Sequence, residues 1–205
     1  MDQIDLFGQL ISIDRMVTMA VITDSDRLVV REWTEADAGD ALGIFGSIEV
    51  ARWLAPAMGQ VPNKATMRLV LRAWIDAGKS LVPPAGRWAV VNKADGEVIG
   101  GLVLSLLPPY EEDFEIGWQL KPAAWGHGFA TEASHALMRW AFATGTIDEL
   151  YAVARPQNLR ACATARRLGM EWVGETEKYY GLAMQVYRIR AAELDAAPLS
   201  RVSNS

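Results

Sequence analysis

The stretch Trp125-Gly126-His127-Gly128-Phe129-Ala130-Thr131-Glu132-Ala133 decides the fold of this chain, because it joins a predicted strand to a predicted helix. Its two glycines lack Cβ atoms, so backbone N–H groups there can approach an anion closely. The first helical turn adds unpaired amides and the positive end of the helix dipole. The stretch therefore predicts a pyrophosphate site, although a tight turn that needs positive φ before a core helix explains the glycines alone equally well.

This turn departs from two other glycine-rich phosphate motifs. A dinucleotide-binding fingerprint has three glycines that open a βαβ unit and an acidic residue about 20 positions later. A P-loop has Gly-Lys followed by Ser or Thr. Neither pattern occurs around the turn, so the chemistry must be sought in its wider surroundings.

Strand and helix patterns alternate ahead of the turn. Leu28 begins the first apolar, β-rich run, and Thr34 with Asp37 resembles a capping box that opens a helix. The Asp95-Gly96 pair is a strong hairpin signal. The predicted elements are a strand at 28–31, helices ending near 45 and covering 48–54 and 64–77, and strands at 88–92, 97–106 and 114–120.

Helical periodicity follows the turn. Apolar residues recur at three- and four-residue spacing from 128 to about 142, which predicts an amphipathic helix. A buried strand at 150–154, a helix at 159–168 and closing strands at 170–173 and 184–189 are predicted after it. This order predicts an α/β fold with one mixed sheet and helices on both faces.

Length and composition favour a single domain. The 205 residues are 51% hydrophobic and 22% charged, which argues against disorder and suffices for a continuous core. We expect the domain to cover residues 28–194. Residues 1–27 precede the first convincing strand and are interpreted as a weakly ordered N-terminal extension, and residues 195–205 are expected to form a flexible tail.

Charge and cysteine content exclude several classes of function. The net charge is −5 and the sequence pI about 5.1, so no general basic field attracts nucleic acid or a membrane surface. Cys162 is the single cysteine, and no Cys or His pair has zinc-ligand spacing, so we expect neither a disulfide nor a metal site. No stretch resembles a signal peptide or a membrane span, and a reducing cytoplasm is the expected location.

Segments on both sides of the turn carry a resemblance to a known family. They are LVVREW at 28–33 with Asp37, GEVIGG at 96–101, EIGW at 115–118, the turn itself, Asn158, RLGM at 167–170, Tyr180-Gly181 and Tyr187. In this register the chain resembles the GNAT N-acetyltransferase superfamily, in the branch of ribosomal-protein alanine and serine N-acetyltransferases. The resemblance covers most of the chain and implies a mostly antiparallel sheet with splayed central strands, the splay often aided by a bulge.

The resemblance implies that acetyl-CoA is the co-substrate, with its pyrophosphate at the turn and its pantetheine arm paired with the main chain of strand 114–120. The family motif has Gln or Arg, two residues, Gly, one residue, then Gly or Ala. Gly128 and Ala130 fit it, whereas Trp125 takes the Gln/Arg position. The implied cofactor-binding residues are Gln119, Leu120, Lys121, Trp125, Gly126, His127, Gly128, Phe129, Ala130, Thr131 and Asn158.

Acetyl transfer to an amine requires a base, because alkylammonium groups with a pKa near 10 are mostly protonated at about pH 7. By resemblance, Glu115 stands where several family members carry a glutamate that removes this proton, often through water. A solvated or salt-bridged strand residue is the alternative role of Glu115. Glu112 and Asp113 are alternative bases in the preceding loop, and His127 is expected to face solvent.

Asn158 begins the helix after the second splayed strand. We expect it to cap that helix and, by resemblance, to contact the CoA arm, which makes it the second catalytic candidate. Ala165 stands where many superfamily members carry the tyrosine that protonates the departing thiolate, so the resemblance assigns no general acid. Tyr179, Tyr180 and Tyr187 are candidates to reach the cleft, with packing roles as the alternative.

The resemblance implies a peptide or small-molecule amine as acceptor, selected by the first two helices and the loop at 108–113. The acidic residues Glu111, Glu112 and Asp113 suit a cationic amine, and a merely solvated loop is equally compatible. Tryptophans are candidates for the pocket wall, with core packing as the alternative. The expected function is direct acetyl-CoA-dependent N-acetyl transfer to a primary amine, the alternative is a non-catalytic CoA-binding regulatory module, and a homodimer is common in the family.

Overall fold

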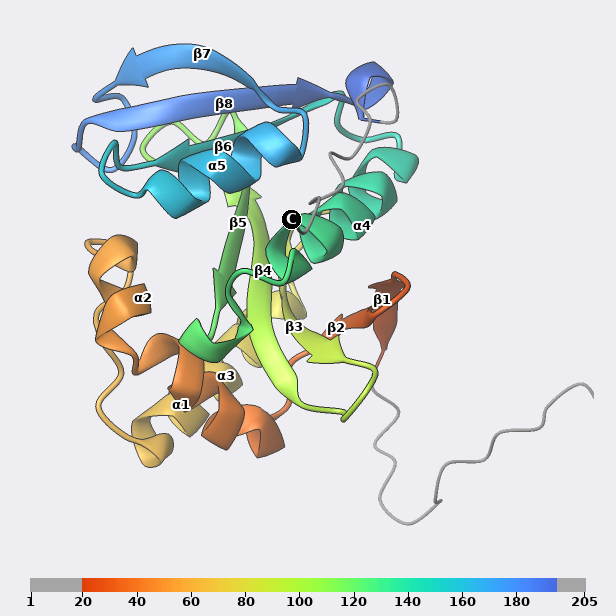
Figure 1. Ribbon diagram of the computed structural model, residues 1–205, viewed down its shortest axis with the longest axis vertical. Helices are drawn as coiled ribbons and strands as arrows, with labels where there is room; N and C mark the ends of the chain where they lie inside the picture. The colour runs from red at the N-terminus through yellow and green to blue at the C-terminus, as the bar shows by residue number, and fades with distance from the viewer. Residues whose placement is uncertain (1–19, 195–205) are drawn as a thin grey trace, which may run out of the picture.

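The computed structural model describes residues 20–194, which form one open sheet of eight strands with helices on both faces (Figure 1). The strand order is β1-β2-β3-β4-β5-β6-β8-β7, and every neighbouring pair except β5 and β6 is antiparallel. The predicted mixed, mostly antiparallel α/β sheet is therefore confirmed. The first 19 residues of the predicted extension and the predicted tail at 195–205 lie outside the described residues.

Most elements begin and end close to their predicted positions. The helices are α1 (Ala38–Phe45), α2 (Ile48–Leu54), α3 (Lys64–Gly78), α4 (Phe129–Ala143) and α5 (Leu159–Arg167). The strands are β1 (Val21–Asp24), β2 (Leu28–Glu32), β3 (Gly86–Asn92), β4 (Val98–Leu106), β5 (Phe114–Leu120), β6 (Glu149–Ala154), β7 (Glu171–Thr176) and β8 (Met184–Arg190). Among the described helices, none is long and apolar enough to cross a membrane.

The capping box predicted ahead of α1 is present. The Asp37 carboxylate accepts a hydrogen bond from Thr34 N–H at 2.8 Å, and Arg31 of β2 forms an ion pair with the same carboxylate at 2.8 Å. A single 3-10 turn, Glu35–Asp37, then leads into the helix. A buried carboxylate is tolerated here because these donors satisfy it.

Strand β1 lies inside the segment predicted to be an extension. It pairs antiparallel with β2 and also contacts α4. It has four residues, and Val21 is 60% exposed, so the strand carries too little of the apolar alternation that marks a strand in sequence. The folded domain therefore includes residues ahead of 28.

Separate layers of helices cover the two faces of the sheet. Helices α1, α2 and α3 pack against one face around a cluster that includes Trp33, Ile44, Met67 and Leu71. Helices α4 and α5 pack against the other face in a larger cluster. In Figure 1, α1 and α3 lie at the lower left and α5 at the top. Each face of the central strands therefore meets a different set of side chains.

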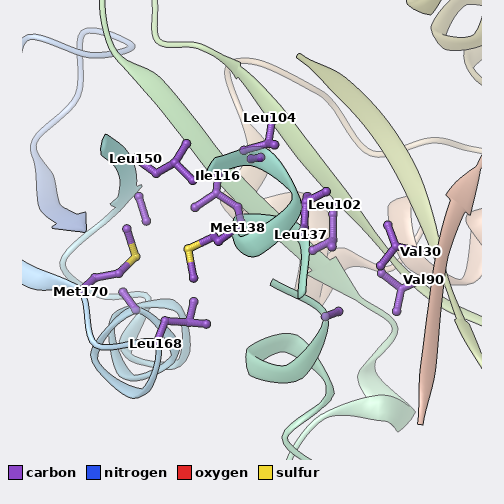
Figure 2. Packing of buried hydrophobic residues seen from close by; sticks show 14 of the residues in the cluster. Val30, Val90, Leu102, Leu104, Ile116, Leu137, Met138, Leu150, Leu168 and Met170 are labelled. Atoms are coloured by element: carbon purple, nitrogen blue, oxygen red, sulfur yellow. The ribbon is translucent and has the colours of Figure 1, made fainter. Parts of the chain in front are cut away.

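Helix α4 is the central helix of the larger cluster. Its residues Leu137 and Met138 are fully buried, and Figure 2 shows them beside Ile116 of β5 and Leu102 and Leu104 of β4. This packing fixes α4, which begins at the glycine turn, against the strand that ends just before the turn. The buried face of α4 thus sets the position of the turn.

Strands β5 and β6 separate along most of their length. They are parallel and share one residue pair, Glu115 with Tyr151, near the beginning of both strands. Strand β5 stays paired with β4 from Phe114 to Leu120 without a register shift, so the separation does not depend on a bulge in β5. The predicted splay is confirmed, and the gap opens toward the carboxyl ends of both strands.

Leu137→Ala is expected to lower the free energy of unfolding by about 2–5 kcal/mol, because it leaves a cavity between α4 and the sheet. Leu69→Ala on α3 is the control: Leu69 is 63% exposed, so the same truncation should change stability by less than about 0.5 kcal/mol. Urea denaturation followed by tryptophan fluorescence measures both variants. Equal effects would contradict the role of α4 as the core helix.

Candidate active site

The glycine turn adopts a conformation that requires glycine. Gly126 and Gly128 have φ values of 82° and 79°, and Gly128 is the N-cap of α4. Glu132 N–H donates to the Gly128 carbonyl at 3.0 Å, so the amides of the preceding helical residues lie outside the ladder. A Cβ at Gly126 would meet no atom within 4 Å. The turn therefore presents unpaired donors and the positive end of the α4 dipole to open space.

An arginine ahead of the predicted domain holds this turn. Arg27 Nη2 donates to the His127 carbonyl at 3.1 Å, and its guanidinium lies 4.6 Å from the centre of the Phe129 ring. The same side chain forms an ion pair with Glu132 at 2.6 Å, and Ser25 donates to that carboxylate at 2.7 Å. No local pattern in the sequence links Arg27 to a residue 105 positions later.

A cavity of about 770 Å³ extends from the turn through the gap between β5 and β6 to the side of the sheet covered by α1, α2 and α3. This volume is typical of small-molecule sites. Lys121 and His127 do not line it, since Lys121 forms an ion pair with Glu97 and His127 is exposed. The predicted site residues that do line it are Glu115, Gln119, Leu120, Trp125, Gly126, Gly128, Phe129, Ala130, Thr131 and Asn158.

Backbone pairing decides which main-chain groups of β5 face the gap. Lys121 N–H donates to the Ile99 carbonyl beside β4 at 3.0 Å, in the register that also pairs Gln119 with β4. Antiparallel partners exchange hydrogen bonds at every second residue, so the main-chain groups of Trp118 and Leu120 point away from β4 toward the gap. Of the three expected main-chain contacts, Leu120 faces the gap, whereas Gln119 and Lys121 face β4, and Trp118 is the further residue whose main chain faces the gap.

Trp125, which takes the Gln/Arg position of the motif, is held from two sides. Its indole Nε1 donates to the Leu120 carbonyl at 2.9 Å and ties the turn to the end of β5. The Arg160 guanidinium, from the first turn of α5, lies 4.3 Å from the centre of the Trp125 ring. Arg160 was not among the predicted site residues. The signal that could have found it is Trp125, which stands where the family motif allows an arginine, so that a positive charge would have to come from another residue.

Glu115 lies where β5 and β6 still touch, and its side chain enters the cavity. The Tyr180 hydroxyl donates to its Oε2 at 2.9 Å. Protein atoms crowd around the carboxyl group, although the residue keeps some exposure to the cavity. Removal from water raises the pKa of Glu115 to about 7, against the lowering effects of the Tyr180 hydrogen bond and the charge of Arg87. Such a carboxyl group exchanges its proton near neutral pH.

The acidic loop before β5 supplies no free negative charge to the cavity. Asp113 accepts hydrogen bonds from Tyr179 at 2.6 Å and Lys178 at 2.9 Å, and Lys178 also lies 3.7 Å from Glu112. Burial raises the pKa of Asp113, but these hydrogen bonds hold it below its ordinary value. None of the three acidic loop residues lines the cavity. The loop is therefore a poor source of an alternative base or of attraction for a cationic amine.

The start of α5 combines a cap with a cavity wall. The Asn158 side chain accepts from Ala161 N–H at 3.3 Å, which confirms the predicted cap, and Asn158 also lines the cavity. Ala165, further along α5, and Tyr187 of β8 are buried and belong to the same wall. Burial raises the pKa of the Tyr187 hydroxyl, so this group stays protonated at neutral pH.

Aromatic side chains wall the half of the cavity on the side of α1, α2 and α3. They are Trp33, Phe45, Trp53 and Trp74. Trp33, Phe45 and Trp74 contact one another with ring centres 5.1 to 6.3 Å apart. Arg87 of β3 also lines this half, and its guanidinium lies 5.5 Å from the centre of the Trp74 ring. We refer to this region as the aromatic half of the cavity.

Comparison with protein families agrees with the splayed strands and the glycine turn. The family model described as an acetyltransferase (GNAT) domain matches residues 27–171. This chain belongs to the GNAT acetyltransferase family. The match contains Glu115 and the whole glycine turn, and it identifies the protein as an acetyltransferase enzyme. Among the described residues of this GNAT protein, no group of three His, Cys, Asp or Glu side chains is placed to hold a metal ion.

Known proteins resemble this GNAT protein in sequence or share its fold. It is 24% identical over 162 residues to the Bacillus subtilis (strain 168) protein named Uncharacterized N-acetyltransferase YoaA. The aligned region covers 78% of this chain and 89% of the relative. A GNAT-family acetyltransferase from Bacillus anthracis superposes with a TM-score of 0.69 at 19% identity, covering 83% of this chain and 99% of that one. The ribosomal-protein-S5-alanine acetyltransferase from Vibrio fischeri superposes with a TM-score of 0.66 at 19% identity, covering 85% and 98%. The predicted family and fold are confirmed, and ribosomal-protein acetyltransferases are among the proteins that share this fold.

Tyr180→Phe is expected to raise the pKa of Glu115 above about 7. The Tyr180 hydrogen bond stabilises the ionised carboxylate, and the variant removes this stabilisation. A hydrogen bond worth about 0.5–1.5 kcal/mol corresponds to a rise of about 0.4–1.1 pKa units. NMR titration of the labelled glutamate carboxyl carbon measures this pKa. Tyr179→Phe is the matched control, since Tyr179 donates to Asp113. An unchanged pKa in Tyr180→Phe would show that the hydroxyl does not act on the carboxylate.

Proposed function

We propose that this GNAT protein transfers acetyl from acetyl-CoA directly to a primary amine, on a peptide N-terminus or on a small molecule. The observation that carries the proposal is the place of Glu115, a carboxyl group with a pKa of about 7 between the glycine turn and the aromatic half of the cavity. The first region suits the cofactor and the second suits an acceptor. The base stands where the two substrates would meet.

The residues around the turn fit acetyl-CoA. Open space before Gly126, the free amides at the start of α4 and the charge of Arg160 suit a pyrophosphate. The main-chain groups of Trp118 and the N–H of Leu120 face the gap and would bind an amide-rich arm as an added strand is bound. Asn158 lines the same cavity. When bound, acetyl-CoA supplies an activated thioester carbonyl, and a backbone N–H that faces the gap stabilises negative charge on its oxygen.

Glu115 acts as the general base in this proposal. An alkylammonium group with a pKa near 10 must lose a proton before its nitrogen can attack. With a pKa of about 7, Glu115 is substantially ionised at neutral pH and still takes up a proton readily. Tyr180 holds one carboxyl oxygen, which leaves the other for the amine, directly or through water.

The alternative of a non-catalytic CoA-binding module is not retained. Its support is Ala165, which stands where many relatives carry the tyrosine that protonates the thiolate. The family match and the raised pKa of Glu115 favour an enzyme. A desolvated carboxyl group can transfer protons near neutral pH, whereas a site that only binds CoA gains nothing from it. We place the reaction in the cytoplasm, whose reducing conditions suit the free thiol of Cys162. A homodimer stays a prediction from the resemblance.

Glu115→Gln is expected to lower turnover by about 10²-fold or more at unchanged acetyl-CoA affinity, because an amide cannot take up the proton. In the wild-type protein, kcat/KM should rise with pH through an apparent pKa of about 7, since ionised Glu115 is the active form. Thiol release from acetyl-CoA, over a panel of N-terminal peptides, polyamines, amino acids and aminoglycosides, measures turnover. Glu112→Gln, in the exposed loop, is the control. Unchanged turnover in Glu115→Gln would remove this residue from the mechanism.

Gly128→Glu should abolish CoA binding, because it places bulk and negative charge at the start of α4. The substitution also strains the backbone at a φ of 79°, so Gly145→Glu is the control. Gly145 follows α4 with a φ of 67°, and a Cβ there meets no atom within 4 Å. Isothermal titration calorimetry with CoA measures affinity, and circular dichroism checks the fold. Normal affinity in Gly128→Glu would place the cofactor elsewhere.

A further inference from the structure

Arg87 lies on the same face of the sheet as Glu115. The register places Arg87 of β3 opposite Val103 of β4, and Val103 opposite Gly117 of β5. Residues opposite each other in a sheet point to the same face, and so do residues two apart along a strand. Glu115, two positions before Gly117, therefore shares the face of Arg87, and both side chains line the cavity.

Val103 and Gly117 lie on the sheet beside these two side chains and line the same cavity. Gly117 stands in the same row as Arg87 and beside Glu115 on β5. A Cβ at this position would come within 2.8 Å of Val103 Cγ1, so a larger residue would crowd the floor of the cavity. Arg87 and Glu115 thus border the same stretch of the cavity floor, which Val103 and Gly117 form.

The Arg87 guanidinium has no anionic partner in direct contact among residues 20–194. Its close neighbour is the face of Trp74, and it senses the charges of Tyr180 and Glu115 at longer range. Partial removal from water lowers the pKa of Arg87. Arg87 nevertheless remains an exposed residue, so its guanidinium is accessible from the cavity. An accessible guanidinium binds a carboxylate well, because its planar donors match the two carboxylate oxygens.

Three other charged residues also line the cavity, one on α2 and two on α5. Arg160 and Arg167 lie on α5, and Arg160 stacks on Trp125 of the glycine turn. Glu49 of α2 accepts a hydrogen bond from Ser47 at 2.6 Å, which lowers the pKa of Glu49 and keeps its carboxylate ionised. Arg87 is therefore the cation of the aromatic half, where Glu49 and Glu115 supply carboxyl groups.

We propose that Arg87 binds a carboxylate of the acceptor, so that the substrate is a small primary amine with a carboxylate and an aromatic body, as in an aromatic α-amino acid. This inference rests on the proposed N-acetyl transfer. The carboxylate pairs with Arg87, the amine lies toward Glu115, and the body packs against Trp74 and its aromatic neighbours. The two fixed charges orient the amine toward the gap that holds the thioester.

Other amine classes match Arg87 less well. In a peptide, the carbonyl group next to the N-terminal amine is part of a peptide bond, so it carries no charge that could pair with the guanidinium. A polyamine brings further positive charge close to Arg87, which is unfavourable. Arg87 therefore selects a zwitterionic acceptor by attraction and disfavours a polycation by repulsion.

The test compares acceptors that differ in the carboxylate: phenylalanine with phenethylamine, tyrosine with tyramine, and tryptophan with tryptamine. Thiol release is measured at about pH 8.5, above the pKa of Glu115, so that a shift of that pKa by the mutation has little effect. Arg87→Gln is expected to lower kcat/KM for the amino acids by about 10- to 100-fold, through KM, and for the amines by less than about twofold. Arg87→Lys should recover part of the loss.

Arg68→Gln, at an exposed arginine of α3 outside the cavity, is the matched control and should change neither class. Equal losses for amino acids and amines in Arg87→Gln would overturn the inference, as would a wild-type protein that acetylates the amines alone. Silence with every acceptor would count against the proposed function for these amines. Calorimetry of the amino acids with CoA-loaded protein then decides on Arg87: binding that Arg87→Gln abolishes supports the carboxylate site, and equal or absent binding overturns it.

Discussion

Strand β5 is paired with β4 along its full length but meets β6 at a single residue pair, and the rest of the site depends on this one-sided pairing. Buried backbone groups without partners are unfavourable, so the open edge of β5 must be satisfied by water, side chains or a ligand. The Trp125 indole satisfies the Leu120 carbonyl and at the same time fixes the glycine turn to the end of the strand. The edge that remains suits an extended, amide-rich ligand, and it leads from the turn to Glu115.

The two faces of β5 have separate roles because successive side chains of a strand alternate. Ile116 and Leu120 point into the cluster beneath α4 and anchor the strand. Glu115 and Gln119 point to the opposite face and line the cavity. A strand of seven residues therefore carries the candidate base on a backbone that the core holds rigidly.

Local patterns predicted most elements and the glycine turn, because the capping box, the hairpin signal and helical periodicity depend on residues close together in the chain. Strand β1 escaped prediction because its four residues gain their place from β2 and α4 rather than from their own alternation. The acidic loop looked like an attraction for cations because its partner, Lys178, lies 65 positions away from Asp113. Contacts between distant segments also place the site residues that were missed, namely Arg27 with Glu132, Arg160 with Trp125, and Arg87 on the face of Glu115.

Two unfavourable features meet at the candidate base. Tyr180, which bonds Glu115, has a φ of 56°, a left-handed conformation that costs a non-glycine residue about 1–2 kcal/mol. Burial raises the pKa of Glu115 from 4.5 to about 7, so the folded protein holds a proton that the unfolded chain has released. The contribution of this group to stability is complete below pH 4.5 and is lost as the pH rises through about 7. The loss therefore falls in the neutral pH range in which the base must act. The left-handed backbone of Tyr180 and the desolvation of Glu115 both weaken the fold, and the desolvation brings the pKa of Glu115 into the range that a proton acceptor needs at neutral pH.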